Sequence, residues 1–311
     1  MPPETRPATH RTPAETHCVV IFNPVKVSDT FRERAESALA AAGWTEVTWL
    51  QTSEDDPGQG RAAEAVRYAA DRVIVAGGDG TVRAVADGLA GSGIPLGIVP
   101  AGTANLLAYN LGLPRREQSA IEVAATGRPR PIDLVKITID GRHSQHFAVM
   151  AGAGLDAMIM DEVRPELKKT FGTAAYLMAA GKAIGRLPMS VRIHVDGQRV
   201  HHRKAIMVLV GNVGGIPPNV DLIPGARYDD GLLDVMVASP RRLRDWLKIV
   251  GRMLIRRQRK DDALELRQGK RIEVVLKEPD SYQLDGDVEG EFTSLVAEIV
   301  PGALHVVFPA P

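Results

Sequence analysis

The chain has 311 residues, in which 38 Lys and Arg balance 38 Asp and Glu, and it contains one cysteine. The balanced charge gives no overall field that would attract nucleic acid, and the length allows two domains and a sizeable core. Cys18 has no intrachain disulfide partner, so we expect a reducing, cytoplasmic setting.

The N-terminal end is expected to be a disordered tail. Residues 1–16 are rich in Pro, Thr and charge and contain no secretory signal. Residues 88–114 carry no charge, but glycines and prolines interrupt them and a polar turn lies in their middle. The sequence therefore predicts no transmembrane helix.

Strand-like and helix-like segments alternate in the first half of the chain. This alternation predicts a mostly parallel sheet with helices on both faces, a three-layer α/β domain over residues 17–131. Pro129-Arg130-Pro131 is expected to end it. The predicted strands are 19–22, 46–50, 72–76 and 94–99, and the predicted helices are 31–42, 61–70, 82–89 and 106–111.

The most informative segment is Gly77-Gly78-Asp79-Gly80-Thr81, between a predicted strand and a predicted helix. Glycines at such a turn let backbone N–H groups approach phosphate oxygens. A carboxylate there would repel phosphate unless a divalent cation lay between them, as Mg²⁺ does. The alternative, left open by these five residues alone, is a tight turn in which Asp79 caps the helix.

A second turn, Pro100 to Asn105, follows the next strand. Gly102, Thr103 and Asn105 again offer backbone donors and short polar side chains. Ligands of open parallel sheets sit at the carboxyl ends of the strands. We therefore expect both turns to face one crevice.

From residue 132 the pattern becomes β-rich, which predicts a second domain of antiparallel sheets over residues 132–302. Asp140-Gly141 and Asp196-Gly197 are hairpin signals. Helices are expected to be inserted at 163–186 and 240–259. His201-His202 is expected in a solvated loop. The predicted strands are 133–140, 147–151, 191–195, 205–211, 233–238 and 271–276.

Taken in chain order, these motifs resemble the diacylglycerol kinase and sphingosine kinase family of lipid kinases, in its stand-alone bacterial form. The likeness spans roughly residues 17 to 308. The motifs that carry it are Asn23-Pro24, Gly77 to Thr81, Pro100 to Asn105, Gly152 to Asp156, Asp229 to Asp234 and Leu284 to Asp287.

The resemblance implies an NAD kinase/diacylglycerol kinase-like α/β domain and a β-sandwich-like domain, with the active site in the cleft between them. The last strand, near 303–308, would return to the first domain. The implied activity is transfer of the γ-phosphate of ATP, with Mg²⁺, to diacylglycerol or a similar lipid alcohol. Two departures are Ala104, where the family commonly has Gly, and a first loop, Asn23 to Lys26, without its usual glycine.

The implied roles fall on few side chains. Asp285 is the expected base that takes the acceptor's proton, and Asp79 is expected to organise Mg²⁺. Asp287 would support the metal or nucleotide, Asp230 a structural cation, and Asp156 the lipid head group or the other domain. The residues expected to bind the nucleotide are Asn23, Lys26, Thr52, Gly77, Gly78, Gly80, Thr81, Gly102, Thr103 and Asn105. A solvated turn at Asp230 and a plain loop threonine at Thr52 remain equal alternatives.

Residues 240–260 hold nine Lys or Arg against one acid, with Trp246 and aliphatic residues at helical spacing. A basic amphipathic helix of this kind suits an anionic membrane surface, so we expect peripheral, transient association with the inner face of the cell membrane. The alternative is a helix packed on its own domain. A homodimer is left open.

Two further readings remain. One is an NAD kinase-like soluble kinase, which shares the Gly-Gly-Asp-Gly turn. The other is a catalytically silent lipid- or nucleotide-binding regulator that kept the fold. The absence of a Gly-x-x-x-x-Gly-Lys-Ser/Thr pattern argues against the P-loop kinases.

Overall fold

The computed structural model describes residues 16–154, 188–217, 220–239 and 264–310. Residues 1–15 of the predicted tail, the helices expected at 163–186 and 240–259, and Asp156 lie outside these residues. No helix in the described ranges is both long enough and apolar enough to cross a membrane.

The first half is the expected parallel sheet, with strand order β4-β3-β1-β2. Side chains alternate along each strand, so successive apolar residues enter the cores on opposite faces. Val73 and Val75 pack with α2 and α3, whereas Ile74 and Ala76 pack with α1 and α5. The strands are β1 (His17–Phe22), β2 (Glu46–Gln51), β3 (Arg72–Gly77) and β4 (Pro95–Pro100), and the helices are α1 (Phe31–Ala41), α2 (Gln59–Arg67), α3 (Asp79–Leu89), α4 (Leu106–Asn110) and α5 (Glu117–Thr126).

Two features of this half differ from the expectation. Helix α5 was not predicted, and its buried face completes the core beside α1. Pro129 and Pro131 do not end the region, because β5 (Arg128–Ile139) runs through both. At these prolines β5 pairs only with β16 (Asp287–Phe308) among the described strands, so no ladder hydrogen bond is lost where proline lacks an N–H group.

The second half is β-rich and antiparallel, as predicted. Asp140-Gly141 and Asp196-Gly197 have positive φ at both residues, the backbone that two-residue hairpin turns require. Its strands are β6 (His143–Phe147), β7 (Met150–Gly154), β8 (Met189–Val195), β9 (Gln198–Ala205), β10 (Met207–Gly211), β11 (Gly215–Ile216), β12 (Val220–Asp221), β13 (Leu233–Ala238), β14 (Leu264–Gly269), β15 (Arg271–Leu284) and β16 (Asp287–Phe308).

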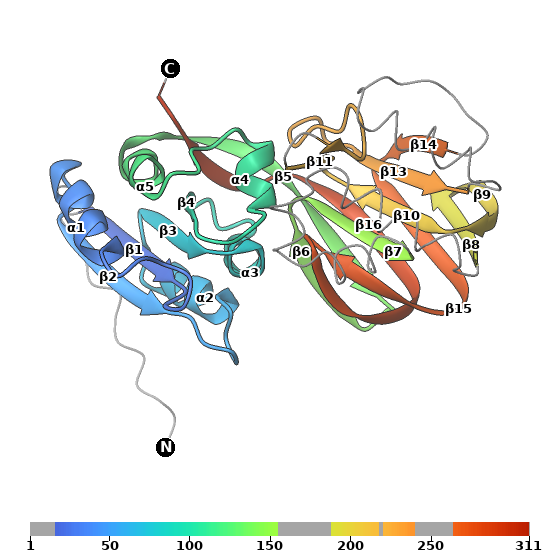
Figure 1. Cartoon of the computed structure of the whole chain (residues 1–311), viewed down its shortest axis with the longest axis horizontal. Helices are drawn as coiled ribbons and strands as arrows, with labels where there is room; N and C mark the ends of the chain where they lie inside the picture. Colours follow the sequence, from blue (N-terminus) through green and yellow to red (C-terminus); the bar gives the residue numbers. More distant parts are fainter. Residues whose placement is uncertain (1–15, 155–187, 218–219, 240–263, 311) are drawn as a thin grey trace, which may run out of the picture.

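Strand β16 connects the two halves (Figure 1). It begins in the hairpin with β15, and its pairing with β5 shifts register between Val300 and Leu304. It then lies parallel to β4 at His305 and Val306. Gly302, with φ +61, supplies the left-handed backbone at this shift. The chain thus ends beside β4, and one extended sheet runs through both halves.

The prediction of a solvated loop at His201 is wrong. His201 lies in β9, is 4% exposed, and its Nδ1 is 3.0 Å from a carboxylate oxygen of Glu265. A charged sequence still forms a strand here, because the antiparallel partner β8 supplies the backbone hydrogen bonds.

Candidate active site

The glycine turn after β3 is shaped by close approaches. Gly78 has an extended backbone and α3 begins at Asp79. A Cβ on Gly77 would lie 2.7 Å from the side chain of Thr81, and one on Gly80 would lie 2.9 Å from a carboxylate oxygen of Asp287. These glycines leave room for the buried threonine and for the hairpin that carries Asp287.

The turn after β4 is closed by its own asparagine. Asn105 has a left-handed backbone, its Oδ1 accepts the N–H of Gly102 at 2.8 Å, and its Nδ2 donates to the carbonyl of Gly102 at 2.8 Å. Five described non-glycine residues have positive φ, and Ala104 is not one of them. Alanine therefore fits this turn without backbone strain.

The structure brings the two turns into contact. The N–H of Ala101 donates to the carbonyl of Gly77 at 2.8 Å, and a Cβ on Gly102 would lie 2.7 Å from the Cα of Gly78. A side chain at Gly102 would force the turns apart.

Asp79 links the turns through its carboxylate. It accepts the N–H of Asn105 at 2.9 Å and of Leu106 at 2.5 Å, so it caps α4 and not its own helix. Each oxygen carries one such bond and keeps a lone pair, the kind of ligand that Mg²⁺ takes together with phosphates and water. Burial raises the pKa of Asp79 to about 6, and the charges of Asp285 and Asp287 add to the rise.

Asp285 enters the same crevice from the second half. It sits with φ +49 in the turn between β15 and β16 and is 4% exposed. Its Oδ1 accepts the N–H groups of Val149 and Met150 at 3.0 and 2.9 Å, whereas its Oδ2 has only a longer contact, 3.3 Å, from Ala148. Burial raises its pKa, while the charge of Arg83 and these N–H groups oppose the rise. Oδ2 is thus the oxygen best able to take a proton.

Arg83 belongs to this site, and our sequence reasoning missed it. It lies four residues after Asp79 on α3, so helical spacing places both on one face, and this signal was available. Its Nη2 contacts Glu289 and lies 3.9 Å from Asp287, which is half-exposed.

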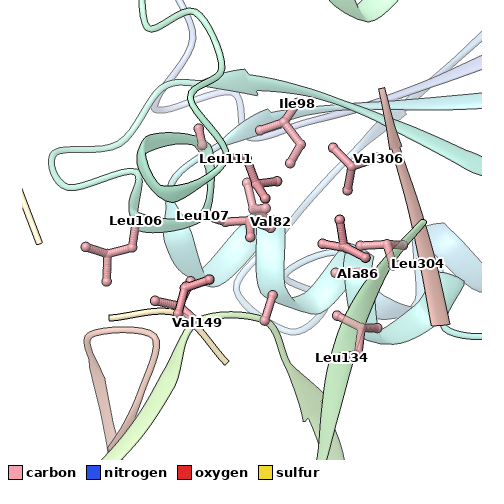
Figure 2. Close-up of a cluster of buried hydrophobic side chains, with 14 of the residues drawn as sticks. Val82, Ala86, Ile98, Leu106, Leu107, Leu111, Leu134, Val149, Leu304 and Val306 are labelled. Carbon is pink, nitrogen blue, oxygen red and sulfur yellow. The ribbon is translucent and has the colours of Figure 1, made fainter. Parts of the chain in front are cut away.

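Between these groups lies a narrow crevice of about 10 Å³, room for about one water molecule. Its polar wall consists of Asp79, Arg83, Asn105 and Asp285. Its apolar wall includes Val82, Leu107 and Val149, and Figure 2 shows Val149 below the side chains of α3 and α4. This apolar packing joins the two halves of the protein and limits water at the polar groups.

A wider cavity of about 560 Å³ opens on the Asn110 side of α4. Asn110 exchanges two hydrogen bonds with the backbone of Gly215, at 2.9 Å each, which fixes α4 against β11. Tyr109, Arg227 and Tyr228 also line this cavity. It is large enough for a small organic group.

The sequence matches two known families in tandem. Residues 17–137 match the diacylglycerol kinase catalytic domain, and residues 148–308 match the YegS C-terminal NAD kinase beta sandwich-like domain. A Xanthomonas euvesicatoria protein named "Probable lipid kinase YegS-like" is 32% identical in an alignment that covers 95% of this chain and 97% of that protein. The chain belongs to the diacylglycerol kinase family.

A second relative and two solved structures are also similar to this chain, and the structures share its fold. The diacylglycerol kinase of Bacillus subtilis is 29% identical over 93% of this chain and 95% of its own. A diacylglycerol kinase from Bacillus anthracis shares the fold, with a TM-score of 0.73, 24% identity and coverage of 96% and 98% of the two chains. An NAD kinase from Archaeoglobus fulgidus shares it more distantly, with a TM-score of 0.50, 13% identity and 94% coverage of each chain.

The first loop of this diacylglycerol kinase homologue lies at the same sheet edge as the glycine turns. The N–H of Asn23 donates to the carbonyl of Ala76 at 2.9 Å, and its Oδ1 accepts the N–H of Val25 at 3.0 Å. Lys26 is exposed, and Thr52, buried after β2, donates its N–H to Phe22. Because β1 lies between β3 and β2, Thr52 is farther from Gly77 along this edge than Asn23 is.

Asp230 is exposed and does not line the crevice that holds Asp79 and Asp285. Its Oδ1 accepts the N–H of Leu232 at 3.0 Å, closing its own turn. Asp133, buried nearby, accepts the N–H groups of Gly231 and Gly302 at 2.8 Å each. Among the described residues no group of three or more His, Cys, Asp or Glu could hold a metal ion, so Asp230 stays a single-carboxylate candidate.

Proposed function

We propose that the protein is an ATP-dependent lipid kinase that transfers the γ-phosphate to the hydroxyl of diacylglycerol or a similar lipid alcohol. One observation carries this proposal: the buried Asp285 carboxylate faces the two glycine turns across one narrow crevice. Membership of the diacylglycerol kinase family supports it. Phosphoryl transfer needs positioned phosphates, cations and an in-line acceptor oxygen.

The glycine turns would hold the phosphates of ATP. Backbone N–H groups at Gly78 and Gly80 lie where no Cβ obstructs an approaching anion, and Gly102 lets the second turn lie close to them. The residues assigned to nucleotide binding are Asn23, Lys26, Thr52, Gly77, Gly78, Gly80, Thr81, Gly102, Thr103, Asn105 and Asp287.

Asp79 fits Mg²⁺, because both of its oxygens keep a lone pair after capping α4. The half-exposed Asp287 would be its second carboxylate. When bound, the cation would neutralise charge on the phosphates. Asp230 would hold a structural cation separately.

Asp285 would act as general base. The acceptor O–H bond breaks as its proton passes to Oδ2, the new O–P bond forms, and ADP leaves as the bond between its β-phosphate oxygen and the γ-phosphorus breaks. Burial of Asp285 raises its pKa, which makes its carboxylate a stronger base.

The acceptor side is assigned from sequence. Asp156 would contact the lipid head group, and the basic segment 240–260 would meet an anionic membrane surface transiently at the inner face of the cell membrane. A homodimer is compatible with these assignments.

A radiolabel assay tests the proposal. The protein, Mg²⁺ and ATP labelled on its γ-phosphate are mixed with micelles of diacylglycerol, monoacylglycerol, ceramide, sphingosine or a polyprenol, with NAD as a soluble acceptor. Label in an organic-extractable lipid is the expected result. Label on NAD alone would favour the NAD kinase-like reading, and no label with tight lipid binding would favour the regulator.

A further inference from the structure

Arg83 brings a largely buried cation to the crevice. Its side chain is 12% exposed, on the face of α3 that carries Asp79. Its Nη2 is held by Glu289, with Asp287 at 3.9 Å. Both acids stand at the start of β16, so the hairpin fixes one edge of the guanidinium.

The other terminal nitrogen, Nη1, is buried without a hydrogen-bond partner among the residues that the structure describes. Leaving a buried donor unsatisfied costs roughly 1–3 kcal/mol, and more for a charged group. Native proteins rarely accept that cost unless a ligand, ion or water completes the bond. Arg83 lines the crevice with Asp79 and Asp285, so we take the missing acceptor to be a ligand atom in the crevice.

The size and charge of the crevice narrow the choice of acceptor. Its volume of about 10 Å³ suits one oxygen-sized group. The carboxylates of Asp79 and Asp285 would repel an anionic oxygen, and a fixed guanidinium beside them offsets that repulsion.

We propose that Arg83 binds the phosphoryl group during its transfer, with Nη1 donating a hydrogen bond to one phosphoryl oxygen. A guanidinium suits this task because it is planar and always charged, so one edge can be anchored while the other binds phosphate. The inference rests on the proposed phosphoryl transfer. It adds Arg83 as the residue that stabilises the negative charge developing on the γ-phosphoryl group.

A purely structural clamp between α3 and the β15–β16 hairpin would use the same Glu289 contact. The clamp and the phosphoryl contact predict different effects on the affinities for ATP and ADP. A clamp acts on ATP and ADP alike, whereas a γ-phosphoryl contact favours ATP.

The test compares Arg83→Ala and Arg83→Lys with Arg34→Ala. Arg34 is a matched control, because it also forms an ion pair with a glutamate, Glu117, at 3.0 Å. It lies on α1, on the opposite face of the sheet from α3. ATP and ADP affinities are measured by calorimetry, with melting temperature and lipid phosphorylation measured in parallel.

We expect Arg83→Ala to lower kcat by roughly 100-fold or more, in line with loss of one transition-state donor. Its ATP affinity should fall about 10-fold more than its ADP affinity, a difference of about 1.4 kcal/mol. Arg83→Lys should be intermediate, free guanidinium ion should restore part of the turnover of Arg83→Ala, and Arg34→Ala should match wild type.

Equal changes in ATP and ADP affinity, with a lowered melting temperature and no rescue by guanidinium, would overturn the proposal in favour of a clamp. A wild type that binds ATP but phosphorylates no acceptor would contradict the proposed function, and the ATP-to-ADP comparison would still test Arg83. A wild type that binds neither nucleotide would overturn both.

Discussion

The carboxylate of Asp79 accepts the backbone N–H of Asn105 at 2.9 Å, so a side chain from one glycine turn caps the helix that follows the other. Asn105 in turn closes its own loop onto Gly102. The residue proposed to hold Mg²⁺ therefore also fixes the relative position of the two turns. Changes that separate the turns should impair nucleotide binding without touching the nucleotide directly.

Gly102→Ala is expected to separate them. Its Cβ would lie 2.7 Å from the Cα of Gly78, and backbone cannot move away as a flexible side chain can. We expect a stability loss of roughly 1–3 kcal/mol, typical of overpacking, with weakened ATP binding. Gly78→Ala is the matched comparison, because its Cβ would meet nothing nearer than 3.5 Å. Equal loss of stability by the two variants in denaturant melts would contradict this account.

Ala104→Gly should not improve the enzyme, although the family commonly has glycine there. Ala104 lacks a positive φ and packs against the core, so alanine is unstrained. Glycine would mainly increase the entropy of the unfolded chain, and we expect a stability loss of roughly 0.4–1 kcal/mol. Chemical denaturation measures it. A gain in stability would mean that alanine strains the turn.

Asp234→Asn should stabilise the protein in a pH-dependent way. Burial raises the pKa of Asp234 to about 6, a hydrogen bond from Gln268 lowers it, and the charge of Asp230 raises it. Because the folded pKa exceeds the unfolded value of 3.8, stability from the protonated form is complete below 3.8 and lost as pH rises through 6. The ionised group then costs stability at neutral pH, by less than the roughly 3 kcal/mol of the full shift because solvent screens part of its charge.

The variant should therefore melt higher than wild type at pH 7.5, and the difference should vanish near pH 4. Asp55→Asn, at an exposed loop position, controls for the change in net charge. A difference between Asp234→Asn and wild type that stays constant across this range would show that ionisation of Asp234 is not its source.

The sequence predicted the parallel sheet and the two turns because glycines and apolar runs are local signals. Contacts made by distant residues were harder to foresee. Val149 donates to Asp285 across 136 positions, and no local pattern records that bond. Arg83 shares a helix face with Asp79, but its contact with Glu289 forms only when β16 folds back, and no local pattern records that contact.

Long strands were also hidden. Strand β16 spans 22 residues, yet Pro301-Gly302 resembles a break between elements. The structure accommodates the pair at the register shift, with the left-handed backbone at Gly302. Likewise the charged residues around His201 predict a solvated loop. Its burial against Glu265 depends on long-range strand pairing that local periodicity does not reveal.

The central claim is that Asp285 accepts the proton of a lipid hydroxyl during phosphoryl transfer from ATP. The most direct test measures transfer of radiolabelled γ-phosphate to diacylglycerol in mixed micelles by wild type and Asp285→Asn, with Glu291→Gln, exposed on the same hairpin, as control. ATP affinity is measured on the same preparations. We predict that wild type and Glu291→Gln label the lipid. Asp285→Asn should bind ATP but transfer label at least roughly 100-fold more slowly than wild type. Equal labelling by Asp285→Asn and wild type would contradict the account.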